Sequence, residues 1–159
     1  MTIFATNGAK FYIGGVKNST SADLTLADFA SETWVEINET ENLGSLGDTA
    51  SEITFDGISS SRTRRKKGTR SAGTMEVVCG IDYADAGQIA LIAAEKMPHD
   101  YAFRLVFNDA PAGGTPSERM FVAAVASAAE ALDTANNIMK LNASLWVNSN
   151  VVRVNAAGA

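Results

Sequence analysis

Residues 74–82 read Thr74-Met75-Glu76-Val77-Val78-Cys79-Gly80-Ile81-Asp82, and this stretch decides the fold. Its apolar side chains recur at every second position, so that one face collects Met75, Val77, Cys79 and Ile81. The opposite face carries polar or small residues and is interrupted only by Val78. Because successive side chains of a strand point to opposite faces, this alternation predicts a half-buried β-strand.

The same period of two recurs along most of the chain. A second strand is predicted at 101–107, where one face would carry Tyr101, Phe103, Leu105 and Phe107. Shorter segments, rich in β-branched or aromatic residues and bounded by Gly, Asn, Ser or Asp, predict strands at 10–16, 34–39, 51–56 and 151–155. Together these segments indicate an antiparallel, mainly β architecture.

Residues 119–147 are open to two interpretations, because their many alanines favour a helix as well as they fit a strand. Apolar residues alternate around Phe121 and again from Met139 to Val147, which favours two strands, at 120–128 and 137–147, joined through 133–136. The segments 18–31 and 110–117 are predicted to be long loops, the first with a helical turn at 24–29.

One helix is expected between the strands, at 85–96. Asp85 is placed to cap its N-terminus, with Gln88 three residues on, as in a capping box. Ile89, Ile92 and Ala93 would form a one-sided apolar stripe with Leu91 beside it. We therefore expect this helix to pack on a sheet.

Composition fits one domain spanning residues 1–159, since the chain has 159 residues of which 46% are hydrophobic. The single cysteine, Cys79, stands at an apolar strand position and is expected to behave as a small buried hydrophobe. The first residues lack a basic stretch followed by an apolar one, so no signal peptide is expected. No apolar run is long enough for a membrane-spanning helix, and no membrane anchor is expected.

The most concentrated chemical feature is a cluster of positive charge. The chain has 13 Lys and Arg residues and a formal net charge of −5. Six of those cations fall within nine positions, at Arg62, Arg64, Arg65, Lys66, Lys67 and Arg70. Small and polar residues flank them, which predicts a long, exposed, mobile basic loop at 59–73. Such a patch attracts either nucleic acid or an acidic protein surface, and the acidic chain favours the second.

Catalytic chemistry is not expected from this sequence. The only histidine, His99, follows Pro98 in a predicted turn, where an exposed surface residue is the better interpretation. No phosphate-binding glycine loop is present, so no nucleotide cofactor is expected. Glu76, Asp82 and Asp85 are explained as a strand end and a helix cap, and we expect neither a metal site nor an enzyme.

Two tryptophans, Trp34 and Trp146, fall in predicted strands where polar residues share their faces. Either they anchor the core or they mark a face that is covered when subunits associate, since aromatic residues are enriched in interface cores. The sequence leaves both interpretations open, with the core slightly favoured.

The order of these elements resembles the tail tube, or major tail, proteins of long-tailed bacteriophages. The resemblance covers about half of the chain, between residues 33 and 103. It is carried by Thr33-Trp34-Val35-Glu36-Ile37, Leu43-Gly44, Ser51-Glu52-Ile53-Thr54-Phe55, Arg62-Thr63-Arg64-Arg65-Lys66-Lys67-Gly68, Ala72-Gly73-Thr74-Met75-Glu76, Asp85-Ala86-Gly87-Gln88 and Tyr101-Ala102-Phe103.

The resemblance implies a sandwich or barrel of two packed antiparallel sheets with one flanking helix. It implies a structural virion protein whose hexameric rings stack into a hollow tube, through which DNA passes during ejection without specific binding. The implied partners are further copies of the chain, a tape measure protein, and terminator and tip proteins. The implied location is the virion tail, after assembly in the host cytoplasm.

In that family a long loop between two early strands reaches the neighbouring ring, and the resemblance places it here at 59–73. Its assembly residues would be Arg62, Arg64, Arg65, Lys66, Lys67, Gly68 and Arg70. We hypothesise that Arg64, Arg65, Lys66 and Lys67 meet carboxylates of the adjacent ring.

Three other functions remain open at this stage. A tail terminator, or the tube protein of a contractile injection machine, shares the implied sandwich. A small nucleic-acid-binding β domain would use the basic loop on phosphates, although that loop has no aromatic residue for stacking on bases. A small hydrolase is the weakest alternative, for want of a catalytic constellation.

Overall fold

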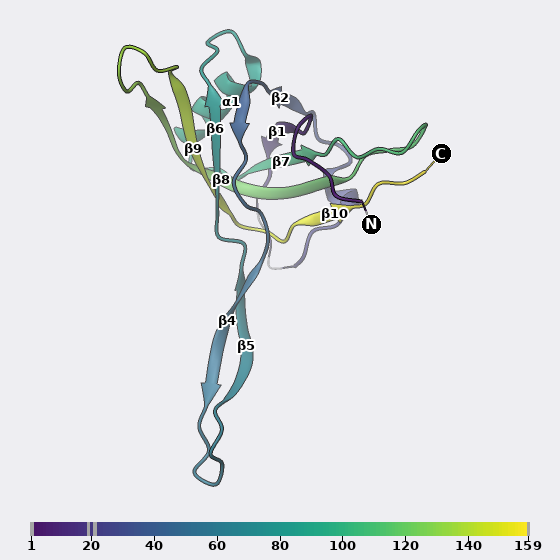
Figure 1. Cartoon of the computed structure of the whole chain (residues 1–159), viewed down its shortest axis with the longest axis vertical. Helices are drawn as coiled ribbons and strands as arrows, with labels where there is room; N and C mark the ends of the chain where they lie inside the picture. Colours follow the sequence, from purple (N-terminus) through teal and green to yellow (C-terminus); the bar gives the residue numbers. More distant parts are fainter. Residues whose placement is uncertain (1, 19, 21, 159) are drawn as a thin grey trace.

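The computed structural model describes residues 2–18, 20 and 22–158. In this part of the chain, strands dominate and one α-helix and one short 3-10 helix accompany them (Figure 1). The strands are β1 (Lys10–Val16), β2 (Val35–Ile37), β3 (Thr40–Asn42), β4 (Thr49–Phe55), β5 (Arg64–Ser71), β6 (Thr74–Gly80), β7 (Tyr101–Val106), β8 (Glu118–Ala131), β9 (Lys140–Val147) and β10 (Val152–Val154). The α-helix is α1 (Ala86–Glu95), and the 3-10 helix is Leu26–Phe29.

Eight of the strands form one antiparallel sheet in the order β2-β1-β7-β8-β9-β6-β3, with β10 also paired to β8. The long strand β8 connects the two halves of this sheet. Its first part, Glu118–Ala123, pairs with β7. Its second part, from Ala123 to Ala131, pairs with β9, and the register of that pairing shifts between Val125 and Ser127. The predicted class, mainly β with antiparallel sheets and one flanking helix, is confirmed. The body is a single sheet whose halves share β8, and the second sheet is the β4–β5 hairpin.

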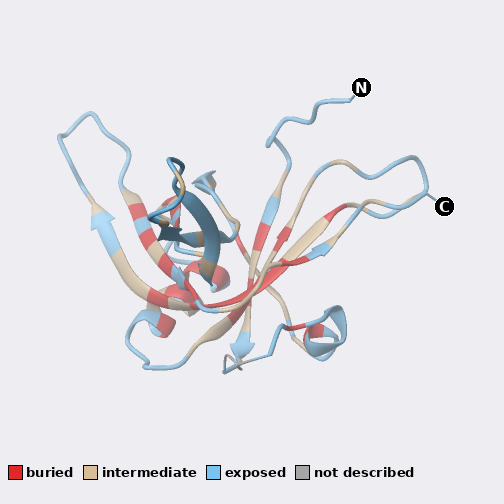
Figure 2. Cartoon of the chain, turned by 90° about the horizontal axis from the view of Figure 1, so that it is seen from below, coloured by how far each residue is buried: buried red, intermediate tan, exposed pale blue. Residues whose placement is uncertain are grey.

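The core lies against one face of the eight-stranded sheet. Alternate residues of β6, Met75, Val77 and Cys79, are buried there as the sequence predicts. Three phenylalanines stack beside them, with ring centroids 5.6 Å apart for Phe11 and Phe103 and 5.7 Å apart for Phe103 and Phe121. Buried residues concentrate near the middle of the molecule, where the strands cross (Figure 2).

The alanine-rich segment is a strand because it is buried on both faces. Phe121, Ala123 and Val125 face the main core, while Met120 and Val122 belong to a second cluster on the other side of the sheet. Central strands covered on both faces read as nearly continuous apolar runs. The predicted strands at 120–128 and 137–147 are therefore confirmed, although β8 is longer than predicted and residues 137–139 belong to the connection.

The helix begins where predicted, at the cap residue Asp85. The Asp85 carboxylate accepts a hydrogen bond from the Gln88 backbone N–H at 2.9 Å and one from the Asn38 side chain at 2.6 Å. The predicted capping box is wrong, because the Gln88 side chain turns away from the cap. Its amide group donates to the carbonyls of Asn38 and Gly80, at 3.0 and 2.9 Å, and so ties the helix to the strand ends.

The predicted apolar stripe of the helix is correct only in part. Ile92 packs against the main core and Leu91 is buried, but Ile89 is 53% exposed and Ala93 is exposed. Gly87 and Ala94 are buried as well. Gly87 lies directly against β2, and a Cβ added there would come within 2.6 Å of the Ile37 Cα atom. This close approach sets the rotation of the helix, so that Leu91 and Ala94, one and two turns on, face the core.

The basic segment corrects another expectation. Only its first part is a connection, because Arg64–Ser71 form strand β5, which pairs with β4 along its length. The strands at 10–16, 34–39, 51–56, 101–107 and 151–155 are each present, with small differences at their ends. The helical turn predicted at 24–29 is the 3-10 helix, and 110–117 is a connection. Among the described residues, no helix has the length and apolarity needed to cross a membrane.

Candidate functional site

The basic residues stand on a two-stranded hairpin that projects from the body of the molecule (Figure 1). Strands β4 and β5 pair from Thr49 with Ser71 at the root to Phe55 with Arg64 near the tip. Almost every residue of both strands is exposed to solvent. At about 3.3 Å per residue, each strand is roughly 25 Å long. An isolated two-stranded hairpin is only marginally stable in water, so a projecting hairpin would gain stability if another surface covered it.

The two faces of the hairpin differ in chemistry. Residues directly opposite each other in an antiparallel pair share a face. Ile53 pairs with Lys66 and Phe55 with Arg64, so apolar and positive side chains share one face, called here the apolar-basic face. The other face carries Thr54 opposite Arg65 and Glu52 opposite Lys67. Ile53 and Phe55 are 55% and 63% exposed, which is unusual for large apolar side chains on a strand.

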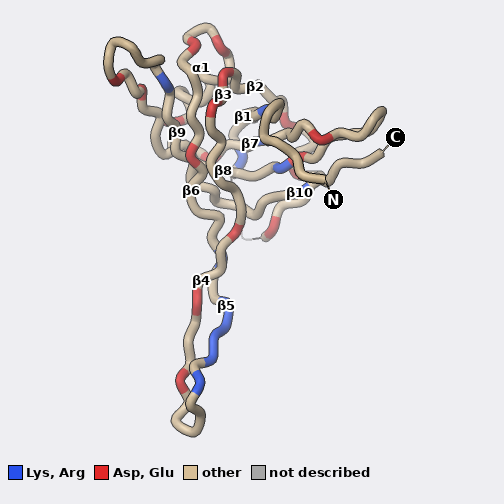
Figure 3. Tube along the Cα trace, viewed as in Figure 1, with Lys and Arg blue, Asp and Glu red and all other residues tan. Residues whose placement is uncertain are grey.

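Not all six cations are free to meet a partner. Arg65 Nε lies 3.2 Å from Glu52 Oε1 on the same hairpin, and Arg70 Nη2 lies 3.0 Å from Asp48 Oδ2 at its root. Within the described residues, no carboxylate pairs with the remaining four, Arg62, Arg64, Lys66 and Lys67. Lys and Arg line β5, whereas Asp and Glu are spread over the molecule, including the connections at the end opposite the hairpin (Figure 3).

Gly68 is the one half-buried residue of β5, and its position explains why it is a glycine. The register between β4 and β5 shifts between Ala50 and Glu52, so the strands carry a bulge there. A Cβ added at Gly68 would lie 2.6 Å from Ser51 Oγ and 3.1 Å from the Ile53 side chain. A bulge increases the local twist of a hairpin, so Gly68 shapes the arm and adds no binding group.

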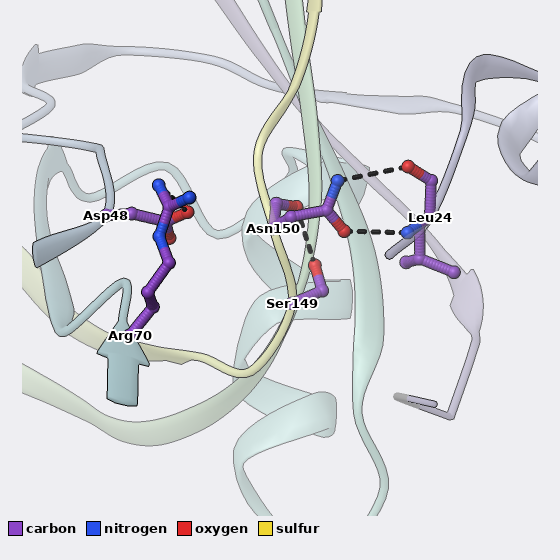
Figure 4. Close-up of polar contacts among 5 residues, drawn as sticks. All are labelled: Leu24, Asp48, Arg70, Ser149 and Asn150. Atoms are coloured by element: carbon purple, nitrogen blue, oxygen red, sulfur yellow. Dashed lines mark hydrogen bonds and ion pairs between the residues drawn. The ribbon is translucent and has the colours of Figure 1, made fainter. Parts of the chain in front are cut away.

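The root of the hairpin borders a polar cavity of about 410 Å³, lined by Asp48, Arg70 and the turn 148–150 among others. Figure 4 shows the two contacts that flank it. The Arg70–Asp48 ion pair joins the ends of the two hairpin strands. Asn150 accepts a hydrogen bond from the Leu24 backbone N–H at 2.7 Å and donates one to the Leu24 carbonyl at 3.0 Å. The ion pair closes the root of the hairpin, and the Asn150 hydrogen bonds hold Leu24 of the 18–31 insert against the turn 148–150.

Sequence reasoning missed Asp48 and Asn150. Asp48 precedes a strand and Asn150 lies in the run Asn148-Ser149-Asn150, so both resemble ordinary turn residues. The one available signal was that run of three turn residues between two strands. It indicated a turn and did not identify Leu24, 126 positions away, as the partner.

The two tryptophans lie in different surroundings. Trp34 is half-buried against the second apolar cluster, with its ring 6.4 Å from that of Phe29 and the Arg104 guanidinium 5.1 Å away. Trp146 is 58% exposed on β9, opposite Thr74 of β6 and Ala124 of β8. The structure does not bring the two residues together, and a role for either at a subunit interface stays a prediction.

Two titratable groups near the core and the start of β8 have shifted pKa values. Burial raises the pKa of the Cys79 thiol to about 11, with a smaller contribution from the negative charge of Asp85, so the thiol stays protonated. Hydrogen bonds from the Ser117 side chain and backbone lower the pKa of Asp109, which thereby holds the start of β8. His99 is exposed. Among the described residues, no three His, Cys, Asp or Glu side chains are grouped to hold a metal ion.

Several solved structures share this fold. The SPP1 tail tube, solved by solid-state NMR and cryo-EM, is similar over 92% of this chain and 76% of that chain, with a TM-score of 0.63 and 17% identity. A chain of the six-fold symmetrised baseplate of the anti-feeding prophage is similar over 98% of both chains, with a TM-score of 0.69 and 10% identity. A chain from the sheath/tube terminator of the extracellular contractile injection system PVC is similar over 97% of this chain and 98% of that chain, with a TM-score of 0.64 and 12% identity.

No protein-family model and no curated protein sequence matches the chain. At such low identity, the structural likeness shows the fold, and the fold is the one found in phage tail tubes and contractile injection systems.

Proposed function

We propose that this chain is the structural subunit of a phage tail tube, in which rings stack into a hollow cylinder. The observation that carries the proposal is the likeness to the SPP1 tail tube over 92% of the chain. The hairpin supports it independently, because exposed apolar side chains rimmed by charge on a projecting arm are typical of a protein interaction site.

Six subunits per ring is the proposed symmetry, by analogy with the six-fold symmetrised baseplate that shares the fold. The tube would let DNA pass without holding it. A chain with a formal net charge of −5 suits that role, since a neutral or acidic lumen does not bind the phosphate backbone. The basic hairpin would then lie away from the lumen and against another protein.

The partners follow from this assembly. Further copies of the chain would form the tube, a tape measure protein would occupy it during growth, and terminator and tip proteins would close its ends. The protein would reside in the virion tail after assembly in the host cytoplasm. Its role would be structural, with no catalysed reaction.

Electron microscopy of negatively stained, purified protein at high concentration tests the proposal, together with light scattering for the mass in solution. The expected result is uniform hollow tubes or stacked six-subunit rings. A protein that remains monomeric at every concentration, also when it is added to preformed tail tips, would contradict the proposal.

A second candidate is a tube or terminator subunit of a contractile injection system, and the likeness to the PVC terminator over 97% of the chain favours it. The same micrographs distinguish a tube subunit of either system, which would form elongated tubes, from a terminator, which would form single closed rings that do not elongate. The nucleic-acid-binding alternative is tested separately, by measuring DNA affinity at increasing salt concentration. If the four free cations bind phosphates, DNA affinity falls steeply between about 50 and 200 mM salt.

A further inference from the structure

The apolar-basic face of the hairpin needs a partner that offers both apolar surface and negative charge. Ile53 and Phe55 are exposed on this face beside Arg64 and Lys66, neither of which has a carboxylate partner among the described residues. Ile58, at the tip, is fully exposed as well. An apolar patch rimmed by charge on a projecting arm is typical of an interaction site.

A surface of matching chemistry lies where α1 meets the ends of β6 and β9. A small cavity of about 40 Å³ opens there, lined by Ile81, Tyr83, Ile89 and Ile92, with the exposed acidic residues Asp82 and Glu130 also lining it. Tyr83 is 64% exposed, and Ile89 is the residue that the predicted stripe would have placed in the core. We call this surface the Asp82–Glu130 cavity.

Few positive charges compete for this cavity. Lys140, at the start of β9, is held by Glu41, with Nζ 2.8 Å from Oε2. No salt bridge within the described residues involves Asp82 or Glu130. Asp82 accepts only a backbone hydrogen bond, from Ala84 at 3.0 Å. Both carboxylates are therefore available to an incoming cation.

The hairpin and the cavity lie at opposite ends of the molecule. Strand β6 begins at the root of the hairpin and ends at Gly80, which pairs with Lys140 at the start of β9. The connections 81–85 and 132–139 therefore lie at the end away from the hairpin, as Figure 1 shows. Several of the acidic positions in Figure 3 lie at that same end. One molecule thus carries two complementary surfaces, and they lie too far apart to contact each other within the same chain.

We propose that the apolar-basic face of the hairpin docks on the Asp82–Glu130 cavity of a second copy of this chain. An apolar side chain of the hairpin fills the cavity, while Arg64 and Lys66 face Asp82 and Glu130. This inference rests on the proposed function and identifies the carboxylates that receive the basic arm. A contact between two different surfaces of identical subunits is heterologous, so it repeats along an axis and leaves the stack open to growth.

Exchanging the charges tests the pairing. Asp82→Lys with Glu130→Lys, or Arg64→Glu with Lys66→Glu, places like charges in contact and lowers the rate of tube growth by at least about tenfold. Combining all four substitutions in one chain restores opposite charges at every contact, and growth returns. The control is Asp23→Lys with Glu95→Lys, which makes the same change in net charge at exposed residues outside the cavity. Growth of the cavity variant at the rate of that control would overturn the pairing.

Cross-linking locates the contact directly. Cys79 is the only cysteine and is buried, so disulfides formed on oxidation will join the introduced cysteines and will not involve Cys79. Phe55→Cys with Tyr83→Cys is expected to give a disulfide-linked ladder of multimers from oxidised tubes. Thr54→Cys with Tyr83→Cys, on the other hairpin face, is the matched control and gives none. Suppose that the wild type forms tubes but the two cysteine pairs give equal ladders, or the first pair gives no ladder. Either result would overturn this inference and leave the proposed function standing. Failure of the wild type to assemble would count against both.

Discussion

At the scale of single residues, Gly87 has the largest structural consequence for its size. The backbone of β2 lies so close that no side chain fits, and this contact rotates α1 away from the orientation that its apolar residues favour. Ile89 is left at the surface as a result, where it lines the Asp82–Glu130 cavity. A structural glycine therefore determines which side chains are available for assembly.

Replacing this glycine with alanine is expected to destabilise the subunit. In an exposed helix the change would stabilise by about 1 kcal/mol. Here the added methyl group meets backbone atoms that cannot move aside cheaply, and overpacking of this kind costs about 1–3 kcal/mol. Urea denaturation of Gly87→Ala measures the change in the free energy of unfolding, with Ala93→Gly at an exposed helix position as the reference for propensity. An alanine variant as stable as the wild type would contradict the packing argument.

Cys79 provides a second prediction at this scale. Its thiol has no exposed surface, and burial raises its pKa from an ordinary value near 9 to about 11. The folded protein therefore holds this proton more tightly than the unfolded chain, and the stabilising contribution of the thiol is present below about pH 9 and lost as the pH rises towards 11. Ellman's reagent at pH 8 is expected to react slowly with the folded protein and rapidly in denaturant. Rapid reaction of the folded protein would show that the β6 face is accessible.

At the scale of elements, the hairpin and the body are separable. The main core contains residues of β1, β2, β6, β7, β8, β9 and α1, and none from β4 or β5. The Arg70–Asp48 pair at the root is exposed on the arginine side, and surface ion pairs contribute at most about 1 kcal/mol. The arm is therefore held by backbone pairing between its own strands, and its sequence is free to serve a partner.

Shortening the arm tests this separation. Removing residues 51–69 and joining Ala50 to Arg70 through Asn-Gly keeps the last paired residues and closes them with a favoured two-residue turn. Circular dichroism and thermal melting of the shortened subunit are expected to match the wild type within a few degrees, while electron microscopy shows no tubes. A shortened subunit that unfolds would mean that the arm stabilises the body, and one that still forms tubes would remove the hairpin from assembly.

At the scale of the whole molecule, positive charge is concentrated on the arm. Lys and Arg line β5, whereas Asp and Glu are spread over the molecule, including the connections at the far end (Figure 3). In the proposed tube, the basic arm would orient approaching subunits head to tail before they touch, because complementary fields steer encounter more than they add to final affinity. This steering would favour stacking in one direction.

Added salt is therefore expected to lower the initial rate of tube growth while it leaves tubes that have already formed intact. The Debye length falls from about 10 Å at 0.1 M to about 3 Å at 1 M salt, which screens the steering field. Light scattering at increasing salt is expected to show a falling initial rate, while tubes already formed persist on dilution into the same buffer. An initial rate that is constant or rises with salt would argue that apolar burial alone drives assembly.

The regular elements were predictable because their signal is local. Alternating burial along 74–80 defines β6, and the Asp85 cap marks where α1 begins. Each of these patterns depends only on neighbours in the chain. The position of the charge cluster was equally plain, because six cations within nine positions need no fold to be recognised. Sequence alone thus determined the fold class and the position of the charge cluster.

The tertiary structure decided the rest, because pairing and packing are not local. Arg64–Ser71 has no apolar alternation, and it is a strand only because β4 pairs with it. The same pairing divides the cations, committing Arg65 to Glu52 while it leaves Arg64 and Lys66 beside Ile53 and Phe55. The rotation of α1 follows from a backbone contact between Gly87 and β2, about 50 positions earlier in the chain. Local periodicity determines which segments are ordered, and only the contacts between distant segments determine which side chains they leave exposed.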